Sequence, residues 1–329
     1  MTTKDRGSDD NGSVDALENN MPTLLVTHPA CLDHLTPPGH PERPDRLRAI
    51  NEVLDGKEFS ALTRAEAPAA PLDTIALCHP MEYIEAIRAA TPQRGMVQID
   101  ADTSMSPGSF EAVLRATGGA LHAVDEVMAR RADNAFVAAR PPGHHAETAR
   151  AMGFCLFNGA AIAARHAQKQ HGLARAAVVD FDVHHGNGSQ DIFWSDASVM
   201  YCSTHEMPLY PGTGARDERG EHDNIVNAPL RSGNGGPQFR EAFESVILPR
   251  LRAFAPDIIV ISAGFDAHMR DPLASLNLLE PDFAWVTQKI MEVANASAQG
   301  RIVSVLEGGY DLEGLSQSAA AHVTALMRG

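Results

Sequence analysis

The run VVDFDVHHGNG at residues 178–188 constrains this chain of 329 residues more than any other segment. Aliphatic residues lead into Asp180, Asp182 and His184, and a Gly-Asn-Gly turn follows. Because side chains alternate faces along a strand, residues two apart share a face. The pattern predicts a buried strand that presents two carboxylates and an imidazole at its carboxyl end, where open α/β sheets bind ligands. Such a donor set without thiolate suits a hydrated divalent ion, although a strand end with solvated acids would show the same run.

Further polar motifs follow the order of the chain. They are RPPGHHA at 140–146, GFCLFN at 153–158, YPGTG at 210–214, AGFD at 263–266 with DP at 271–272, and EGGY at 307–310. Each motif alone is a weak signal. In this order, the set resembles the histone deacetylase and acetylpolyamine amidohydrolase family, and within it the class II-like branch. The resemblance extends from about Thr23 to the C-terminus and implies the arginase–deacetylase fold.

The alternation of β-rich and helical stretches predicts a mostly parallel sheet with helices on both faces. Length alone suggests about two domains, but the motifs must meet at one site, so we expect a single α/β catalytic domain over residues 21–329. The polar residues 1–20 are expected to form a disordered leader. Strands are predicted at 23–27, 135–139, 176–180, 199–203, 258–262 and 302–306, and helices at 43–54, 81–90, 109–129, 159–170, 238–254, 281–298 and 312–327.

The composition excludes several classes of protein. A net charge of −15 argues against a general nucleic-acid binder, which needs a basic surface. No apolar run reaches membrane-spanning length, so no membrane association is expected. The four cysteines are scattered without a CxxC pair, which favours a reduced, cytoplasmic protein. The acidic surface would help the approach of a lysine on a basic protein, and solubility explains the charge equally well. The sequence does not decide the oligomeric state.

Asp182, His184 and Asp266 are the predicted metal ligands. Asp182 and His184 share the strand face, and Asp266 follows the strand at 258–262; a turn or helix-capping acid is the alternative for Asp266. All three match the family's ligands, which implies one Zn²⁺ per chain, although this donor set also accepts iron(II) or cobalt(II). The resemblance further implies a structural potassium ion at Asp180, Asp182, the His184 backbone, Ser203 and Thr204.

The resemblance also assigns the catalytic groups. His145 would act as general base and then general acid, while His144 assists electrostatically and is oriented by Asp180. Asn187 stands where some family members carry a second aspartate, and an amide cannot stabilise imidazolium as a carboxylate does, so the pKa of His145 should be less elevated. Tyr310 follows a glycine pair and would donate to the developing oxyanion while zinc polarises the same oxygen. The alternatives are a surface histidine pair and a core tyrosine.

A substrate tunnel is implied by the same comparison. Phe154 and Tyr210 match its two aromatic walls, which would hold an aliphatic stem between them, and Gly153 would offer its carbonyl to the substrate amide. Ordinary aromatic packing is the alternative. Three assignments remain. Leu273 would lie at the tunnel mouth, Asp102 would be an acid at the rim that binds the substrate backbone, and Arg43 would line the acetate exit.

The predicted function is zinc-dependent removal of an acetyl (or other acyl) group from a lysine-like ε-amine, with acylated lysine or a small acylated amine as substrate. Acetylpolyamine deacetylation is the rival within the family. Ureohydrolysis on the same fold requires a second metal and further ligands. A non-catalytic acyl-lysine binder should lack Tyr310 or a metal ligand, and all of these residues are present.

Overall fold

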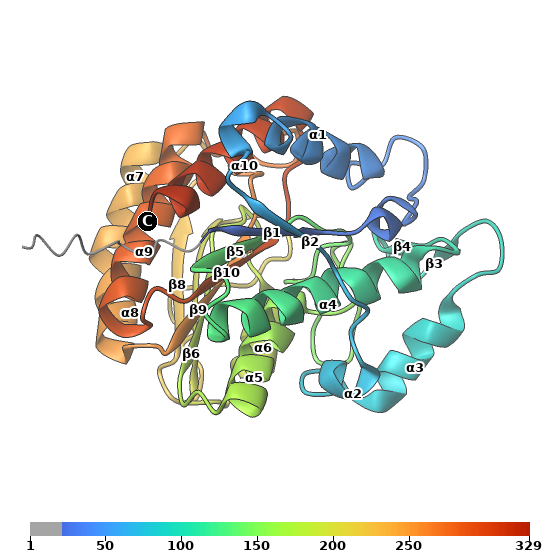
Figure 1. Cartoon of the computed structure of the whole chain (residues 1–329), viewed down its shortest axis with the longest axis horizontal. Coiled ribbons are helices and arrows are strands. Elements are labelled where there is room, and N and C mark those ends of the chain that lie inside the picture. Colours follow the sequence, from blue (N-terminus) through green and yellow to red (C-terminus); the bar gives the residue numbers. More distant parts are fainter. Residues whose placement is uncertain (1–21) are drawn as a thin grey trace, which may run out of the picture.

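The computed structural model describes residues 22–329, so the leader predicted at 1–20 lies outside the described residues. A single eight-stranded sheet runs through the molecule in the order β2-β1-β5-β10-β9-β6-β7-β8 (Figure 1). Every neighbouring pair in it is parallel. Its strands are β1 (Leu24–Thr27), β2 (Thr63–Glu66), β5 (Asn134–Val137), β6 (Ala176–Asp180), β7 (Val199–Glu206), β8 (Ile225–Leu230), β9 (Ile258–Ala263) and β10 (Ile302–Leu306). The short strands β3 (Val97–Gln98) and β4 (Ser104–Met105) form a separate antiparallel pair.

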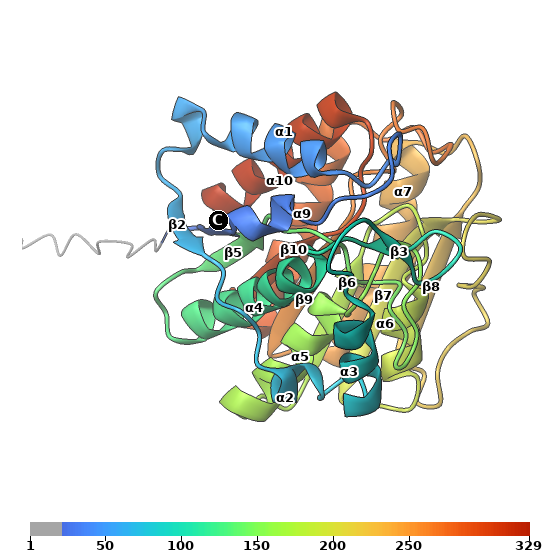
Figure 2. The same cartoon turned by 90° about the vertical axis from the view of Figure 1, so that its right-hand side faces the viewer.

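Helices cover both faces of this sheet, as the sequence predicts. Helices α1, α9 and α10 lie on one face, and α4 and α5 lie on the other (Figures 1 and 2). Their bounds are α1 Pro44–Leu54, α2 Leu72–Ile75, α3 Met81–Ala90, α4 Ser109–Met128, α5 Gly159–His171, α6 Asn187–Phe193, α7 Gly236–Ala242, α8 Leu248–Phe254, α9 Glu280–Ser297 and α10 Leu312–Arg328. None of the helices within residues 22–329 is long and apolar enough to cross a bilayer.

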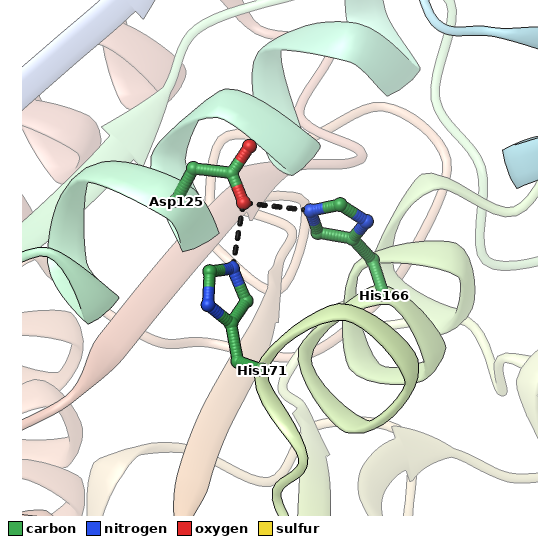
Figure 3. Close-up of side chains that lie close together, drawn as sticks. All are labelled: Asp125, His166 and His171. Atoms are coloured by element: carbon green, nitrogen blue, oxygen red, sulfur yellow. Dashed lines mark hydrogen bonds and ion pairs between the residues drawn. The ribbon is translucent and has the colours of Figure 1, made fainter.

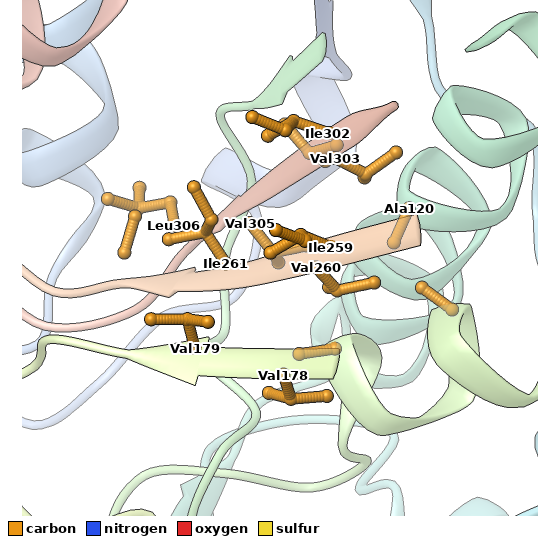
Figure 4. Packing of buried hydrophobic residues seen from close by; sticks show 14 of the residues in the cluster. Ala120, Val178, Val179, Ile259, Val260, Ile261, Ile302, Val303, Val305 and Leu306 are labelled. Atoms are coloured by element: carbon orange, nitrogen blue, oxygen red, sulfur yellow. The ribbon is translucent and has the colours of Figure 1, made fainter. Parts of the chain in front are cut away.

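The core lies along the central strands, whose side chains are apolar on both faces. Val178, Val260 and Val303 are completely buried, and so is Ala120 of α4, which belongs to the same apolar cluster (Figure 4). Strands of a parallel sheet covered by helices on both sides read as continuous Val/Ile/Leu runs. Carboxylates and histidines follow these apolar runs where β6, β9 and β10 leave the core.

The six predicted strands are all present, with bounds that move by up to three residues. The prediction missed β2 and β8, the two edges of the sheet. Strand β8 contains Pro229, which cannot donate to a ladder and is tolerated at an edge. The helix predicted at 238–254 is divided by a π-helical turn at Phe243–Ile247. Pro249 follows this turn, and its missing N–H interrupts the helical hydrogen bonding.

Candidate active site

The loops after the carboxyl ends of β6 and β9 bring the predicted metal ligands together. Nδ1 of His184 lies 3.1 Å from Oδ1 of Asp182 and 3.1 Å from Oδ2 of Asp266, and all three residues are buried. The expectation that Asp182 and His184 share a strand face is wrong, because β6 ends at Asp180. They meet in the turn that follows, where the backbone N–H of His184 donates to Oδ1 of Asp182.

Two glycines let the backbone approach these carboxylates. A Cβ atom at Gly264 would lie 2.0 Å from Oδ2 of Asp182, and one at Gly308 would lie 2.0 Å from Oδ2 of Asp266. The N–H of Gly308 donates to Oδ2 of Asp182 at 2.8 Å. Neither position therefore has room for a side chain.

The charges at this cluster fit a cation. Burial raises the pKa of Asp266, and the charge of Asp182 raises it further, to about 7. Burial alone would lower the pKa of His184, but hydrogen bonds to Asp182 and Asp266 raise it to about 10. Two buried carboxylates with oxygens within 4.8 Å of each other repel unless a positive charge, here the His184 proton or a metal ion that replaces it, lies between them. Their oxygens and the His184 nitrogen could thus hold one divalent metal ion.

His144 is held by the other carboxylate of the motif. Its Nδ1 lies 3.0 Å from Oδ2 of Asp180, and the hydroxyl of Tyr201 donates to the same oxygen at 3.0 Å. Burial lowers the pKa of His144, but the charges of Asp182 and Asp180 outweigh it and raise this pKa well above its ordinary value. Asp180 and Asp182 therefore favour the protonated form of His144.

His145 has the opposite character. Its Nδ1 lies 2.8 Å from Oδ1 of Asn187, and the amide nitrogen of Asn187 donates to Oε1 of Glu147 at 2.8 Å. Because Glu147 fixes the amide, the Asn187 oxygen accepts from Nδ1–H, and Nε2 of His145 keeps a free lone pair. Burial and the nearby charges of His144 and His184 hold the pKa of His145 well below its ordinary value.

Glu307 supports the histidine loop, a role that the sequence did not suggest. It is completely buried, and Oε2 accepts from the N–H groups of Gly143 at 2.6 Å and His144 at 3.1 Å. Its Oε1 accepts from the Ser262 hydroxyl at 3.2 Å. Burial raises the pKa of Glu307 to about 7. The strand β10 therefore positions the loop that carries both histidines.

A cavity of about 210 Å³ opens above these groups. The ring of Tyr210 meets the His145 ring edge-on at 5.2 Å, and the ring of Phe154 meets the Tyr310 ring edge-on at 5.9 Å. All five residues predicted for the tunnel line this cavity, namely Gly153, Phe154, Tyr210, Leu273 and Asp102. The other lining residues are His145, His184, Leu209 and Tyr310. It is a mainly apolar channel with polar groups at its base.

The wall at Gly153 and Phe154 has an unusual backbone. Both residues have positive φ values, +58° and +69°, and a Cβ atom at position 153 would lie 2.3 Å from the His145 ring. A positive φ is strained for phenylalanine. Oδ1 of Asp102 accepts from the N–H of Gly153 at 3.0 Å, and the Thr103 hydroxyl accepts from that of Phe154 at 3.0 Å. Asp102 thus fixes the tunnel wall as well as lining the rim.

Tyr310 is supported from below by Arg46, which the sequence reading did not single out. The Arg46 guanidinium lies 4.8 Å from the Tyr310 ring centroid and donates to the carbonyls of Gly309 and Glu307, each at 2.5 Å. Arg46 is completely buried. By contrast, the side chain of Arg43 is 45% exposed and pairs with Asp45. Arg43, predicted for an acetate exit, therefore lies at the surface, and Arg46 is the arginine packed against the Tyr310 ring.

The residues predicted for potassium also lie together. Asp180 at the end of β6 pairs with Ser203 of β7 in the sheet register. Ser203 and Thr204 are buried, and the Thr204 hydroxyl has no hydrogen-bond partner. The unpartnered Thr204 hydroxyl thus lies on the strand next to β6, and a buried polar oxygen without a hydrogen-bond partner needs a ligand such as water or a cation.

Comparison with known proteins decides the family. Residues 40–326 match the family described as "Histone deacetylase domain". The chain belongs to the histone deacetylase family. This member is 38% identical to a "Probable deacetylase" of Archaeoglobus fulgidus, over 94% of this chain and 87% of that protein. It is 38% identical to the "Histone deacetylase-like amidohydrolase" of Pseudomonas aeruginosa, over 83% of this chain and 73% of that protein.

The fold of this histone deacetylase family member is confirmed by a solved structure. The crystal structure of the HDA15 HD domain superimposes with a TM-score of 0.88 and 35% identity, covering 93% of this chain and 88% of that one. The single α/β domain with a parallel sheet is therefore the deacetylase fold. Family membership supports deacetylase activity, which is hydrolysis of an acylated amine.

Proposed function

We propose that this protein is a zinc-dependent amidohydrolase that removes acetyl or other acyl groups from lysine-like ε-amines, with one catalytic Zn²⁺ per chain. The observation that carries the proposal is the cavity lined by His184, His145 and Tyr310 at its base and by aromatic rings along its walls. Apolar walls suit an aliphatic stem, and the polar base suits an amide. This is the hydrolysis of a linear amide C–N bond.

Asp182, His184 and Asp266 would hold the metal. A bound Zn²⁺ supplies a Lewis acid that polarises the amide carbonyl and lowers the pKa of water. The donor chemistry fits, because a ligand set of two carboxylates and one imidazole leaves a position open for substrate or water. Gly264 and Gly308 fit the same role, since they allow the backbone to hold the Asp182 and Asp266 carboxylates in place.

His145 would accept the proton of the attacking water. Its Nδ1–H is committed to Asn187 and the residue lines the cavity, so the free Nε2 would be the base. The low pKa of His145 keeps it neutral before the reaction. Once protonated, it would deliver that proton to the leaving amine, and acetate and free amine result.

His144 and Tyr310 would stabilise the negative charge that develops. Asp180 favours the protonated form of His144, whose ring centroid lies 4.0 Å from that of His145. Burial raises the pKa of Tyr310 well above its ordinary value, so its hydroxyl remains protonated and can donate to the oxyanion. Arg46 would keep the Tyr310 segment in place through the Gly309 carbonyl.

The proposal also includes a structural potassium ion and a cytoplasmic location for the protein. Asp180, Ser203 and the unpartnered Thr204 hydroxyl support a monovalent cation beneath the active site. The four cysteines are unpaired and buried, which supports a reducing, cytoplasmic compartment.

Within residues 22–329, only one candidate metal cluster is fully buried, so a ureohydrolase with two adjacent metals is a weaker candidate. The deciding experiment measures kcat/KM for an acetyl-lysine peptide, N-acetylputrescine and arginine with the zinc-loaded protein. Turnover of the peptide above both other substrates supports the proposal. Turnover of arginine alone would refute it.

A further inference from the structure

A second cluster of metal-binding side chains lies between α4 and α5. Asp125 comes from the last turns of α4, and His166 and His171 come from the C-terminal half of α5 (Figure 3). Nε2 of His166 and Nε2 of His171 each lie 2.7 Å from the same oxygen, Oδ1 of Asp125. The two imidazole rings are nearly perpendicular, at 82°, with centroids 5.7 Å apart. Three potential ligands from two helices thus point to one place.

This cluster is separate from the active site. Helix α4 ends at Met128, shortly before β5 begins at Asn134, and α5 ends at His171, shortly before β6 begins at Ala176. Both helix ends therefore lie at the amino ends of their strands, whereas the catalytic groups follow the carboxyl ends. A strand of five residues spans roughly 16 Å. A ligand at the cluster would not touch the substrate.

The donors suit a divalent ion of the zinc class. Two imidazole nitrogens and one carboxylate oxygen are zinc ligands, and a fourth position would be left for water. In a tetrahedral site with bonds of about 2.0–2.1 Å, neighbouring donor atoms are roughly 3.3 Å apart. The observed 2.7 Å separations must therefore open by about 0.6 Å.

The surroundings allow this movement and attract a cation. The side chains of Asp125, His166 and His171 are 43%, 14% and 23% exposed, so an ion can enter from solvent. Burial raises the pKa of Asp125, but hydrogen bonds from both histidines outweigh it and lower this pKa below its ordinary value. Asp125 is therefore a carboxylate at neutral pH. Without an ion, the same residues only connect the two helices through hydrogen bonds.

We infer that Asp125, His166 and His171 bind a second divalent metal ion, which joins α4 to α5 and stabilises the fold without taking part in catalysis. Each imidazole loses its Nε2 proton, to solvent or by moving to the Nδ1 tautomer, and the ion replaces both N–H···O hydrogen bonds with bonds to Nε2 and to the carboxylate. An ion that binds only the folded chain raises its stability by mass action.

The test is equilibrium dialysis of the chelator-treated full chain against Zn²⁺, with metal counted per chain. Wild type should bind one equivalent more than His166→Gln or His171→Gln. His122→Gln is the matched control, since His122 also lies on α4 but faces Glu126, 3.9 Å away, and it should bind as many ions as wild type. The His184→Ala variant should retain the α4–α5 equivalent, which distinguishes this site from the proposed catalytic one.

Thermal unfolding gives a second readout. Added Zn²⁺ should raise the Tm of His184→Ala by at least about 3 °C, and this rise should vanish when His166→Gln is combined with it. All variants outside the active site should keep kcat/KM within about twofold of wild type. Two results would overturn the inference: equal metal counts for wild type and His166→Gln, or a loss of bound metal in His122→Gln as large as in His166→Gln. The three residues would then only form hydrogen bonds between the two helices.

Discussion

Asn187 fixes the tautomer of His145. Its amide oxygen lies 2.8 Å from Nδ1 of His145, while its amide nitrogen is held by Glu147 at the same distance. A carboxylate at position 187 would accept the same hydrogen bond but would add a negative charge. The choice between amide and acid at position 187 therefore changes the pKa of His145 without changing the position of its ring.

Asn187→Asp should move the acid limb of the pH profile to higher pH. The new carboxylate favours the imidazolium form of His145, so a larger fraction is already protonated and cannot accept a proton. We expect kcat/KM of the variant to fall by roughly threefold or more between pH 8 and pH 6. Wild type should change less over this range, because its His145 pKa is low. Identical profiles for the two proteins would contradict the assignment of His145 as base.

Tyr310→Phe should lower kcat by about 10²-fold or more with little change in KM, because loss of one oxyanion donor has that effect. The phenyl ring retains the contacts to Phe154 and Arg46. Steady-state kinetics on an acetyl-lysine peptide measure the result. Tyr83→Phe is a suitable control, since its hydroxyl donates to the Leu156 carbonyl outside the cavity. A variant at 310 with near-wild-type kcat would exclude this donor.

Removal of the metal should abolish activity, and Zn²⁺ should restore it. The buried Asp182, His184 and Asp266 cluster could hold one metal ion. We expect reactivation of the His166→Gln protein to reach its plateau at about one equivalent per chain. The measurement is a titration of chelator-treated protein followed by activity. A requirement for two ions in this variant would favour a two-metal reaction.

The sequence predicts the part of the site that local motifs carry. The pattern at 178–188 predicts Asp182 and His184 beyond the carboxyl end of a strand, where the structure has them, and the five residues predicted for a tunnel line one cavity. The strand geometry was wrong in detail, because the chain leaves β6 after Asp180 and turns. A turn and a strand end can bring the same donors together, and alternation alone does not distinguish them.

Residues whose role comes from distant partners could not be found in this way. Arg46 contacts the carbonyls of Glu307 and Gly309, more than 250 residues along the chain, and Glu307 holds the loop at Gly143. Nothing in the neighbouring sequence marks either one as buried. A long-range hydrogen bond between a side chain and the backbone becomes visible only when the fold brings both partners together.

Leu273→Glu should shift specificity toward acetylpolyamines. Leu273 lines the cavity, and a leucine leaves the distant ammonium of such a substrate unpaired as it loses water. We expect kcat/KM for N-acetylputrescine, relative to an acetyl-lysine peptide, to rise by about 10–10²-fold if the new ion pair contributes about 1.4–3 kcal/mol. Leu273→Gln is the uncharged control. Wild type that already prefers N-acetylputrescine would refute the predicted role of Leu273.

Glu42→Gln should destabilise the fold most strongly at neutral pH. Burial raises the pKa of Glu42, but Arg140 and His34 outweigh it and lower this pKa well below its ordinary value of 4.5. A depressed folded-state pKa contributes stability above the unfolded-state pKa, and this stability is lost as the pH falls through the folded-state pKa.

Removing one partner of this buried group should cost about 3–5 kcal/mol, because Arg46 and Arg140 lose the carboxylate that they share. Asp45→Asn is the control. The Asp45 side chain is 48% exposed and pairs with Arg48 at the surface, so the loss of its charge should lower the free energy of unfolding by less than about 1 kcal/mol. Urea unfolding at pH 7 and pH 4 measures both effects. The difference in free energy of unfolding between wild type and Glu42→Gln should be smaller at pH 4 than at pH 7. A larger difference at pH 4 would contradict a lowered pKa of Glu42 in the folded state.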